Sequence, residues 1–178
     1  MKLLKLFVVV LAAAALALLV TPVANAQEPT TLVVELSAEN EIPGCPLGEE
    51  SGAGGYAVVQ IDEATGEISY RVVAFKLPGT VRPQGLGGHI HIGDATVAGP
   101  VVLPLQLTGL STGLVAAGTT TDPALATAIL DNPENYYLNI HTDVCTGGAI
   151  RGTTRVTTPR ERARSLSHGD LLLRSWIP

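Results

Sequence analysis

Residues 56–77 have the sequence YAVVQIDEATGEISYRVVAFKL, in which two runs rich in β-branched and aromatic residues flank a short polar segment. We expect strands over residues 56–62 and 68–77, because such runs fit a pleated, half-buried surface. The segment between them, Glu63–Gly66, ends in a glycine that adopts positive φ without steric cost. The stretch therefore predicts a β-hairpin and an antiparallel sheet around it.

Short strands are expected on both sides of this hairpin. Leu32, Val34 and Leu36 lie two residues apart, a spacing typical of a half-buried strand over residues 31–37. Turns rich in glycine and proline separate the other expected strands, at residues 89–92, 101–107, 114–120, 136–142 and 149–157. Many short strands with turn signals at this spacing indicate an all-β fold, an antiparallel β-sandwich.

One short helix is expected among the strands. Asp122 is a favourable N-cap, and Pro123 suits the first position of a helix that runs to Leu130. Asn132-Pro133 ends it, because a residue before proline disfavours helical geometry. The sequence thus predicts a β-sandwich with a single helical insertion.

The first 26 residues are typical of a signal peptide. Lys2 and Lys5 precede an apolar run over residues 6–20, and Ala24-Asn25-Ala26 matches an Ala-x-Ala cleavage signal. The alternative, an uncleaved membrane anchor, is disfavoured because the run is shorter than the roughly 20 residues that span a bilayer. We therefore expect a secreted, extracellular protein that starts at Gln27, with no membrane span after cleavage.

The charge of the remaining chain excludes some partners. Without the two signal-peptide lysines the chain has 9 basic against 16 acidic residues, a net charge of −7. This balance argues against binding to nucleic acid or to an anionic membrane surface. Residues 27–158 are expected to form one domain.

Residues 159–178 form a tail with four arginines and two acidic residues. Its loop-like composition indicates a disordered extension. The alternatives are that its arginines pack against the acidic domain, or that its Leu-Trp end contacts a partner.

Two of the four histidines lie one residue apart, between glycines, in the expected strand over residues 89–92. Positions two apart in a strand point to the same face, so His89 and His91 project together. Ile90 and Ile92 are then expected on the opposite face, in the core.

The expected strand over residues 136–142 has the same pattern. Tyr137, Asn139 and His141 share one face, whereas Leu138 and Ile140 are expected in the core. If the two histidine strands are neighbours, about 4.8 Å apart, His89, His91 and His141 can converge on one ion. Three imidazoles suit copper or zinc. The alternative is a set of ordinary histidines on an exposed strand face.

The order of several short motifs resembles that of a CHRD domain, the module named after chordin. These motifs are LSAENEIP (36–43), IDEATG (61–66), HIHIG (89–93), GPVV (99–102), NPENYYLNIHT (132–142) and GGAIRG (147–152). The resemblance extends from about Thr31 to Arg155. It implies an immunoglobulin-like antiparallel sandwich, and it implies little about activity.

A more distant resemblance is to copper/zinc superoxide dismutase, a Greek-key β-sandwich that also has a His-x-His strand followed by Gly-Asp and Gly-Pro. It implies that His89, His91 and His141 occupy copper-ligand positions and that Arg151 lies close to the position of a substrate-guiding arginine. Asn139, which shares the face of His141 by strand parity, is expected near the same site. The chain departs from that family in three respects. Val101 stands where the metal-bridging histidine is expected, no further cluster supplies a zinc site, and the catalytic loop is shorter.

Cys45 and Cys145 are the only cysteines, an even number in an exported chain, which favours a disulfide. The alternative keeps both reduced, as thiolate ligands of copper beside the histidines. A bridge would hold the polar loop over residues 39–55 next to the histidine face, because Cys145 follows His141 by four residues.

Two hypotheses about function follow. The first is a secreted, non-enzymatic binding or matrix module whose partner is an extracellular protein or the cell surface. The second is a three-histidine copper protein with redox activity. Neither assigns a catalytic residue.

Overall fold

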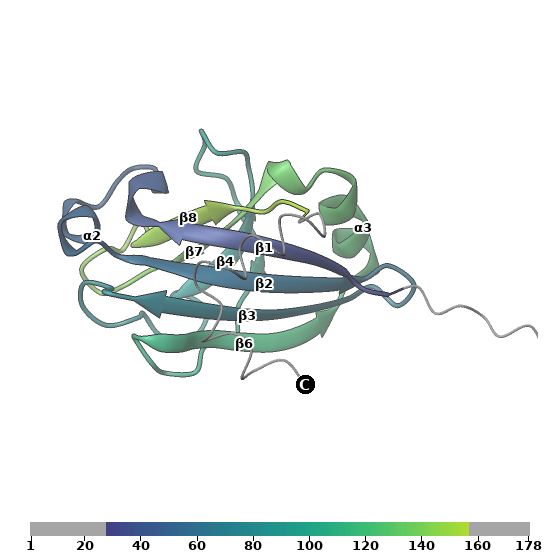
Figure 1. Cartoon of the computed structure of the whole chain (residues 1–178), viewed down its shortest axis with the longest axis horizontal. Helices are drawn as coiled ribbons and strands as arrows, with labels where there is room; N and C mark the ends of the chain where they lie inside the picture. The colour runs from purple at the N-terminus through teal and green to yellow at the C-terminus, as the bar shows by residue number, and fades with distance from the viewer. Residues whose placement is uncertain (1–27, 157–178) are drawn as a thin grey trace, which may run out of the picture.

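The computed structural model describes residues 28–156. The predicted signal peptide and the predicted disordered tail lie outside these residues, so both stay predictions. Within the described part, the predicted domain forms an all-β antiparallel sandwich with short helical segments at its ends (Figure 1).

Eight strands form one antiparallel sheet in the order β5-β4-β7-β8-β1-β2-β3-β6. Their bounds are β1 Thr30–Ser37, β2 Gly54–Asp62, β3 Glu67–Phe75, β4 Gly88–Ile92, β5 Val101–Pro104, β6 Gly113–Thr121, β7 Tyr136–Ile140 and β8 Ile150–Thr153. The expected hairpin is confirmed as β2 and β3, which pair from Gly54↔Phe75 to Asp62↔Glu67. Gly66 closes the turn with φ 71°, and its N–H donates to the carbonyl of Asp62 at 2.8 Å.

The sheet curls until its two ends meet. β5 pairs with β4, and the chain that follows β5 crosses to β6 at the other end of the strand order. There Ala117 N–H donates to the Gln106 carbonyl, and Thr108 N–H donates to the Val115 carbonyl, both at 3.0 Å. The curl leaves β4 and β7 behind β1, β2 and β3 in Figure 1, so the sheet forms two facing layers.

The apolar core fills the space between these layers. The alternation predicted for β1 is confirmed, because Leu32, Val34 and Leu36 are all buried. From the opposite layer, Ile90 of β4 and Leu138 and Ile140 of β7 belong to the same cluster. Each such side chain stabilises the fold by roughly 1.5–3 kcal/mol when it is fully buried.

The helices partly correct the sequence prediction. The expected helix is present as α3, Pro123–Asp131, with Asp122 accepting a hydrogen bond from Leu125 N–H at 3.0 Å. A second helix, α2 (Pro46–Ser51), was missed in the polar loop. Proline in its first turn and a left-handed Gly52 at its end are the signals that mark it. Two 3-10 segments, η1 (Ala38–Asn40) and η2 (Pro133–Asn135), complete the helical structure of the described chain.

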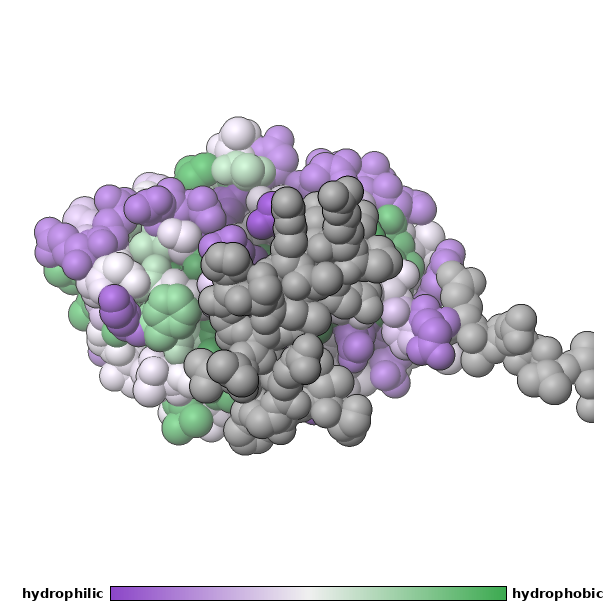
Figure 2. Space-filling view, in the orientation of Figure 1, coloured by the Kyte–Doolittle hydropathy of each residue, from purple (hydrophilic) through white to green (hydrophobic). Residues whose placement is uncertain are grey.

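Hydrophilic side chains gather along the upper rim of one face, over α2, η1 and α3 (Figure 2). One predicted core residue is on the surface instead. Ile92, the last residue of β4, has 41% of its surface exposed, because the chain leaves the sheet at Gly93 before the second layer can cover it.

Candidate metal centre

Three histidines meet on the face of β4 and β7 that is turned away from the apolar core. His89 and His91 lie on β4, and His141 directly follows β7, its neighbour in the sheet. One ring nitrogen of each histidine lies within 4.8 Å of those of the other two. The convergence expected from strand parity is therefore present.

Three backbone carbonyls determine which nitrogen of each ring carries the proton. His89 Nε2 lies 3.1 Å from the carbonyl of Gly85, and His91 Nδ1 lies 2.8 Å from that of Gly99. His141 Nδ1 lies 3.1 Å from that of Thr146. Because a carbonyl only accepts, each of these nitrogens is the donor in a neutral ring. The lone pairs are thus left on His89 Nδ1, His91 Nε2 and His141 Nε2.

These lone pairs have no protein donor to satisfy them. His89 Nδ1 faces His141 Nε2 at 3.2 Å, so in neutral rings two acceptors point at each other. His91 Nε2 is buried without any hydrogen-bond partner. Two nitrogens bound to one ion at about 2.0–2.1 Å lie roughly 3.3 Å apart at a tetrahedral angle. The donor set therefore fits a transition-metal ion, and backbone carbonyls orient the ligand rings as metal sites require.

The histidines are more buried than the sequence predicted. We expected their face of the sheet to be open to solvent, but the exposed fractions of His89, His91 and His141 are 7, 8 and 8%. The loops that carry the three carbonyls fold over this face. In addition, the Tyr137 ring stacks on His91, with centroids 4.7 Å apart and planes 8° from parallel.

Burial favours the neutral form of two of the imidazoles, those of His91 and His141. It lowers the pKa of His141 from 6.5 to about 4, and the neighbouring His89 adds to that effect. Burial also lowers the pKa of His91, although the hydrogen bond with Gly99 opposes it. A neutral imidazole is the form that binds metal, so protons compete with metal for these two rings only in acid.

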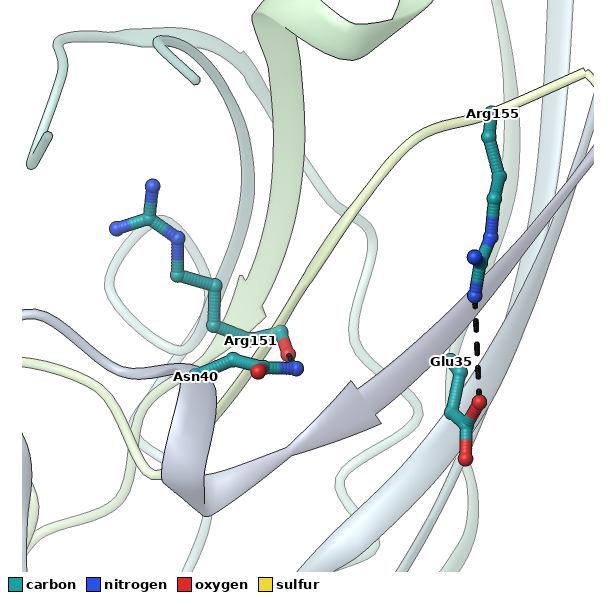
Figure 3. Close-up of polar contacts among 4 residues, drawn as sticks. All are labelled: Glu35, Asn40, Arg151 and Arg155. Carbon is teal, nitrogen blue, oxygen red and sulfur yellow. Dashed lines mark hydrogen bonds and ion pairs between the residues drawn. The ribbon is translucent and has the colours of Figure 1, made fainter. Parts of the chain in front are cut away.

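Arg151 has a different environment from the one the superoxide dismutase resemblance implies. Its side chain is 1% exposed, and its guanidinium donates to the carbonyls of Asp94 and Val97 at 2.6 and 2.7 Å. It also lies 3.4 Å from the centroid of the Tyr137 ring. Figure 3 shows the guanidinium directed away from the exposed Glu35–Arg155 ion pair, while the Arg151 carbonyl accepts from Asn40. Arg151 thus holds the loop that follows β4.

The same loop positions His91. Gly99 supplies the carbonyl that fixes the His91 ring, and a Cβ at Gly99 would collide with the carbonyl of Ile92. Only glycine allows this close approach. Val101, which stands where a bridging histidine is expected, pairs with His91 across β4 and β5 and is 47% exposed.

Two buried polar residues, Asn139 and Glu41, lie beside the cluster, and the sequence analysis identified only the first. Asn139 was expected near the site, and it is 3% exposed. Glu41 was not singled out, yet it is 5% exposed, and burial raises its pKa from 4.5 to about 8 despite the attraction of Arg151. Its position in the LSAENEIP motif shows no periodicity that would have revealed this burial.

The family of this chain follows from comparison with known proteins. A family model described as the CHRD domain matches residues 32–154. That is more than half of the sequence. The chain belongs to the CHRD family. No curated protein and no solved structure matches it.

The CHRD domain contains the predicted disulfide. Cys45 and Cys145 are bonded, with Cα atoms 5.8 Å apart and 100 residues between them in sequence. The alternative of thiolate ligands is therefore wrong for this structure. The bridge ties the start of α2 to the loop that follows His141, as expected. None of the helices in residues 28–156 is long and apolar enough to cross a membrane.

A cleft of this CHRD domain lies apart from the histidines. It has a volume of about 850 Å³ and lies along β1 and β8, lined by residues that include Glu35, Glu39, Asp94 and Glu134. None of the three histidines lines it. The chemistry of the imidazoles, rather than the size of the cleft, therefore identifies the candidate site.

Proposed function

We propose that this protein is a secreted CHRD module that binds one transition-metal ion, copper by preference, without catalysing a reaction. His89 Nδ1, His91 Nε2 and His141 Nε2 hold the ion. The observation that carries the proposal is the pair of acceptor nitrogens, His89 Nδ1 and His141 Nε2, that face each other at 3.2 Å. A bound ion turns this repulsive contact into two favourable bonds.

The chemistry of the ligands favours copper over the other divalent ions. Three imidazoles bind copper and zinc well, whereas magnesium and calcium take oxygen ligands. For a given nitrogen site, copper binds more tightly than zinc. A non-enzymatic role is supported by the burial of all three rings and by Arg151, whose guanidinium is bonded to loop carbonyls. Within residues 28–156, the three histidines are the sole group of this kind that can hold a metal.

Secretion is part of the same proposal. It is supported by the Cys45–Cys145 disulfide, because such bonds persist in oxidising compartments outside the cytosol. The N-terminal pattern supports cleavage after Ala26. N-terminal sequencing of protein collected from the medium is expected to begin at Gln27, and mature protein with an intact Met1 would contradict it.

Copper titration of metal-free protein without a histidine tag tests the metal site. We expect one ion per chain for the wild type and loss of stoichiometric binding for His91→Ala. The matched control is His168→Ala, which removes the fourth histidine of the sequence and should bind like the wild type. Equal uptake by all three proteins, or uptake by none, would overturn the metal site and leave the CHRD module with an extracellular macromolecule as its partner.

A further inference from the structure

Three buried polar atoms near the cluster have no hydrogen-bond partner. They are Glu41 Oε1, Asn139 Oδ1 and His91 Nε2. Their side chains are 5, 3 and 8% exposed. A buried polar atom without a partner costs roughly 1–3 kcal/mol, so three of them in one region require an explanation.

Asn139 is the residue that connects the other two. Its side chain interacts with the carboxyl group of Glu41 and also with the ring of His91. With its amide nitrogen toward Glu41, its oxygen faces His91 Nε2, and two acceptors then meet. A half-turn of the amide reverses this, so that nitrogen faces His91 Nε2 and oxygen faces Glu41. The second orientation is satisfied only if Glu41 carries a proton.

We propose that Glu41 and Asn139 form a two-state relay that couples metal binding at His91 to release of one proton from Glu41. In the metal-free state, the Glu41 O–H donates to Asn139 Oδ1, and Asn139 Nδ2 donates to His91 Nε2. All three atoms then have partners. When an ion takes the His91 lone pair, the amide turns, Asn139 Nδ2 donates to the Glu41 carboxylate, and the proton leaves to solvent. No electron is transferred, and the inference rests on the proposed metal site.

The surroundings of Glu41 suit this role. Burial keeps the carboxyl group protonated at neutral pH, since it raises the pKa of Glu41 to about 8. Arg151 of β8 is the charged group that acts on it, and the Ile42 N–H also stabilises the ionised form. Both favour the carboxylate once the amide has turned. The carboxyl group rests against Gly148, where a Cβ would collide with it, so the loop after Cys145 confines it.

Calorimetric titration of the wild type with Cu²⁺ and with Zn²⁺ tests the coupling, at pH 7 in buffers of different ionisation enthalpy. We expect Glu41→Gln to release about one proton fewer per bound ion than the wild type, because its amide donates to Asn139 permanently and cannot ionise. The matched control is Glu39→Gln, an exposed residue of η1, the 3-10 segment that ends just before Glu41, and this variant should release as many protons as the wild type. Equal proton release from Glu41→Gln and the wild type would overturn the relay and leave the metal site intact.

The metal-free half of the relay is tested by NMR without any ion. At pH 6 the ¹³C shift of the Glu41 carboxyl group should be that of a carboxylic acid, and Asn139→Leu should change the ¹⁵N shift of His91 Nε2. A Glu41 carboxylate at pH 6 would overturn the relay. Failure of the wild type to bind either metal would overturn the proposed function and the coupling together, so the two failures are distinct.

Discussion

The two faces of β4 and β7 are both buried, but opposite physical effects govern them. One face places Ile90, Leu138 and Ile140 in the apolar core, where each is fully buried. The other face places His89, His91 and Asn139 under a cover of loops, with exposed fractions of 3 to 8%. Alternation along the same two strands produces both faces.

The difference shows which face stabilises the fold. Burial of an apolar side chain is favourable by itself, whereas a buried polar group costs free energy unless it is hydrogen-bonded. The polar face retains unpaired acceptors on His91 and Asn139. The apolar face therefore stabilises the fold, whereas the polar face lowers its stability.

The largest expected change in stability comes from removal of the disulfide that holds the loop after His141. Replacing Cys45 and Cys145 together by alanine should lower the free energy of unfolding by about 4–5 kcal/mol, because the bridge closes a loop of about 100 residues. Urea unfolding of the variant and of the oxidised wild type measures the loss. A difference below about 1 kcal/mol would mean that the loops over the histidines are held without the bridge.

Substitutions of Ile90 and His91, neighbours in β4, compare how much each face contributes to the free energy of unfolding. Ile90→Ala should lower the free energy of unfolding by about 2–5 kcal/mol, because it leaves a cavity in the core. His91→Ala should lower the stability of the metal-free protein by less than Ile90→Ala does, because a buried imidazole contributes mainly its hydrogen bonds to Gly99 and Asn139, each worth about 1 kcal/mol. Thermal unfolding of both variants without metal measures this. A larger loss for His91→Ala than for Ile90→Ala would reverse the comparison.

Glu41 should make the fold less stable as the pH rises from about 4.5 to about 8. Its folded-state pKa of about 8 lies above the unfolded value of 4.5, so its contribution to stability is present below pH 4.5 and is lost as the pH rises through 8. Glu41→Gln should therefore be more stable than the wild type by about 3 kcal/mol at pH 7 and by about 1 kcal/mol at pH 5. Urea unfolding at both pH values tests this, with Glu39→Gln as the control. An advantage that did not grow with pH would contradict the burial of a protonated acid.

The smallest expected change in stability occurs at acid pH and comes from protonation of His141. Its folded-state pKa of about 4 lies below the unfolded value of 6.5, so its contribution is present above pH 6.5 and is lost as the pH falls through 4. For metal-free protein the loss between pH 8 and pH 5 should be about 2 kcal/mol. It is best measured in the Glu41→Gln background, because Glu41 changes the stability in the opposite direction. His141→Gln in that background should reduce the acid loss by this amount and leave the part that comes from His91, whose pKa burial also lowers. An unchanged profile would assign the loss to another group.

Much of the fold was predictable because its strands obey a period of two. Leu32, Val34 and Leu36 mark β1, and Gly66 marks the hairpin, since both signals are local. The same parity predicted that His89, His91 and His141 would converge. The predicted disulfide is confirmed as well, from a count of two cysteines.

The features that the sequence did not predict depend on contacts between segments that are distant in the sequence. Parity states which face a side chain takes, but it does not state what covers that face. The burial of the three histidines depends on the loops that contain Gly85, Gly99 and Thr146, and that of Glu41 depends on Gly148. Arg151 was placed near the site by resemblance, whereas its bonds to two loop carbonyls required the structure.

The crossing of the chain from β5 to β6 has a consequence for behaviour at high concentration. A free strand edge is a template on which a second copy can add its own strand. Here the ends of the sheet meet, and the outer edge at β5 is four residues long, with Pro100 before it and Pro104 at its end. Prolines lack the N–H that such pairing needs. The fold thereby offers few strand edges from which amyloid-like association can start.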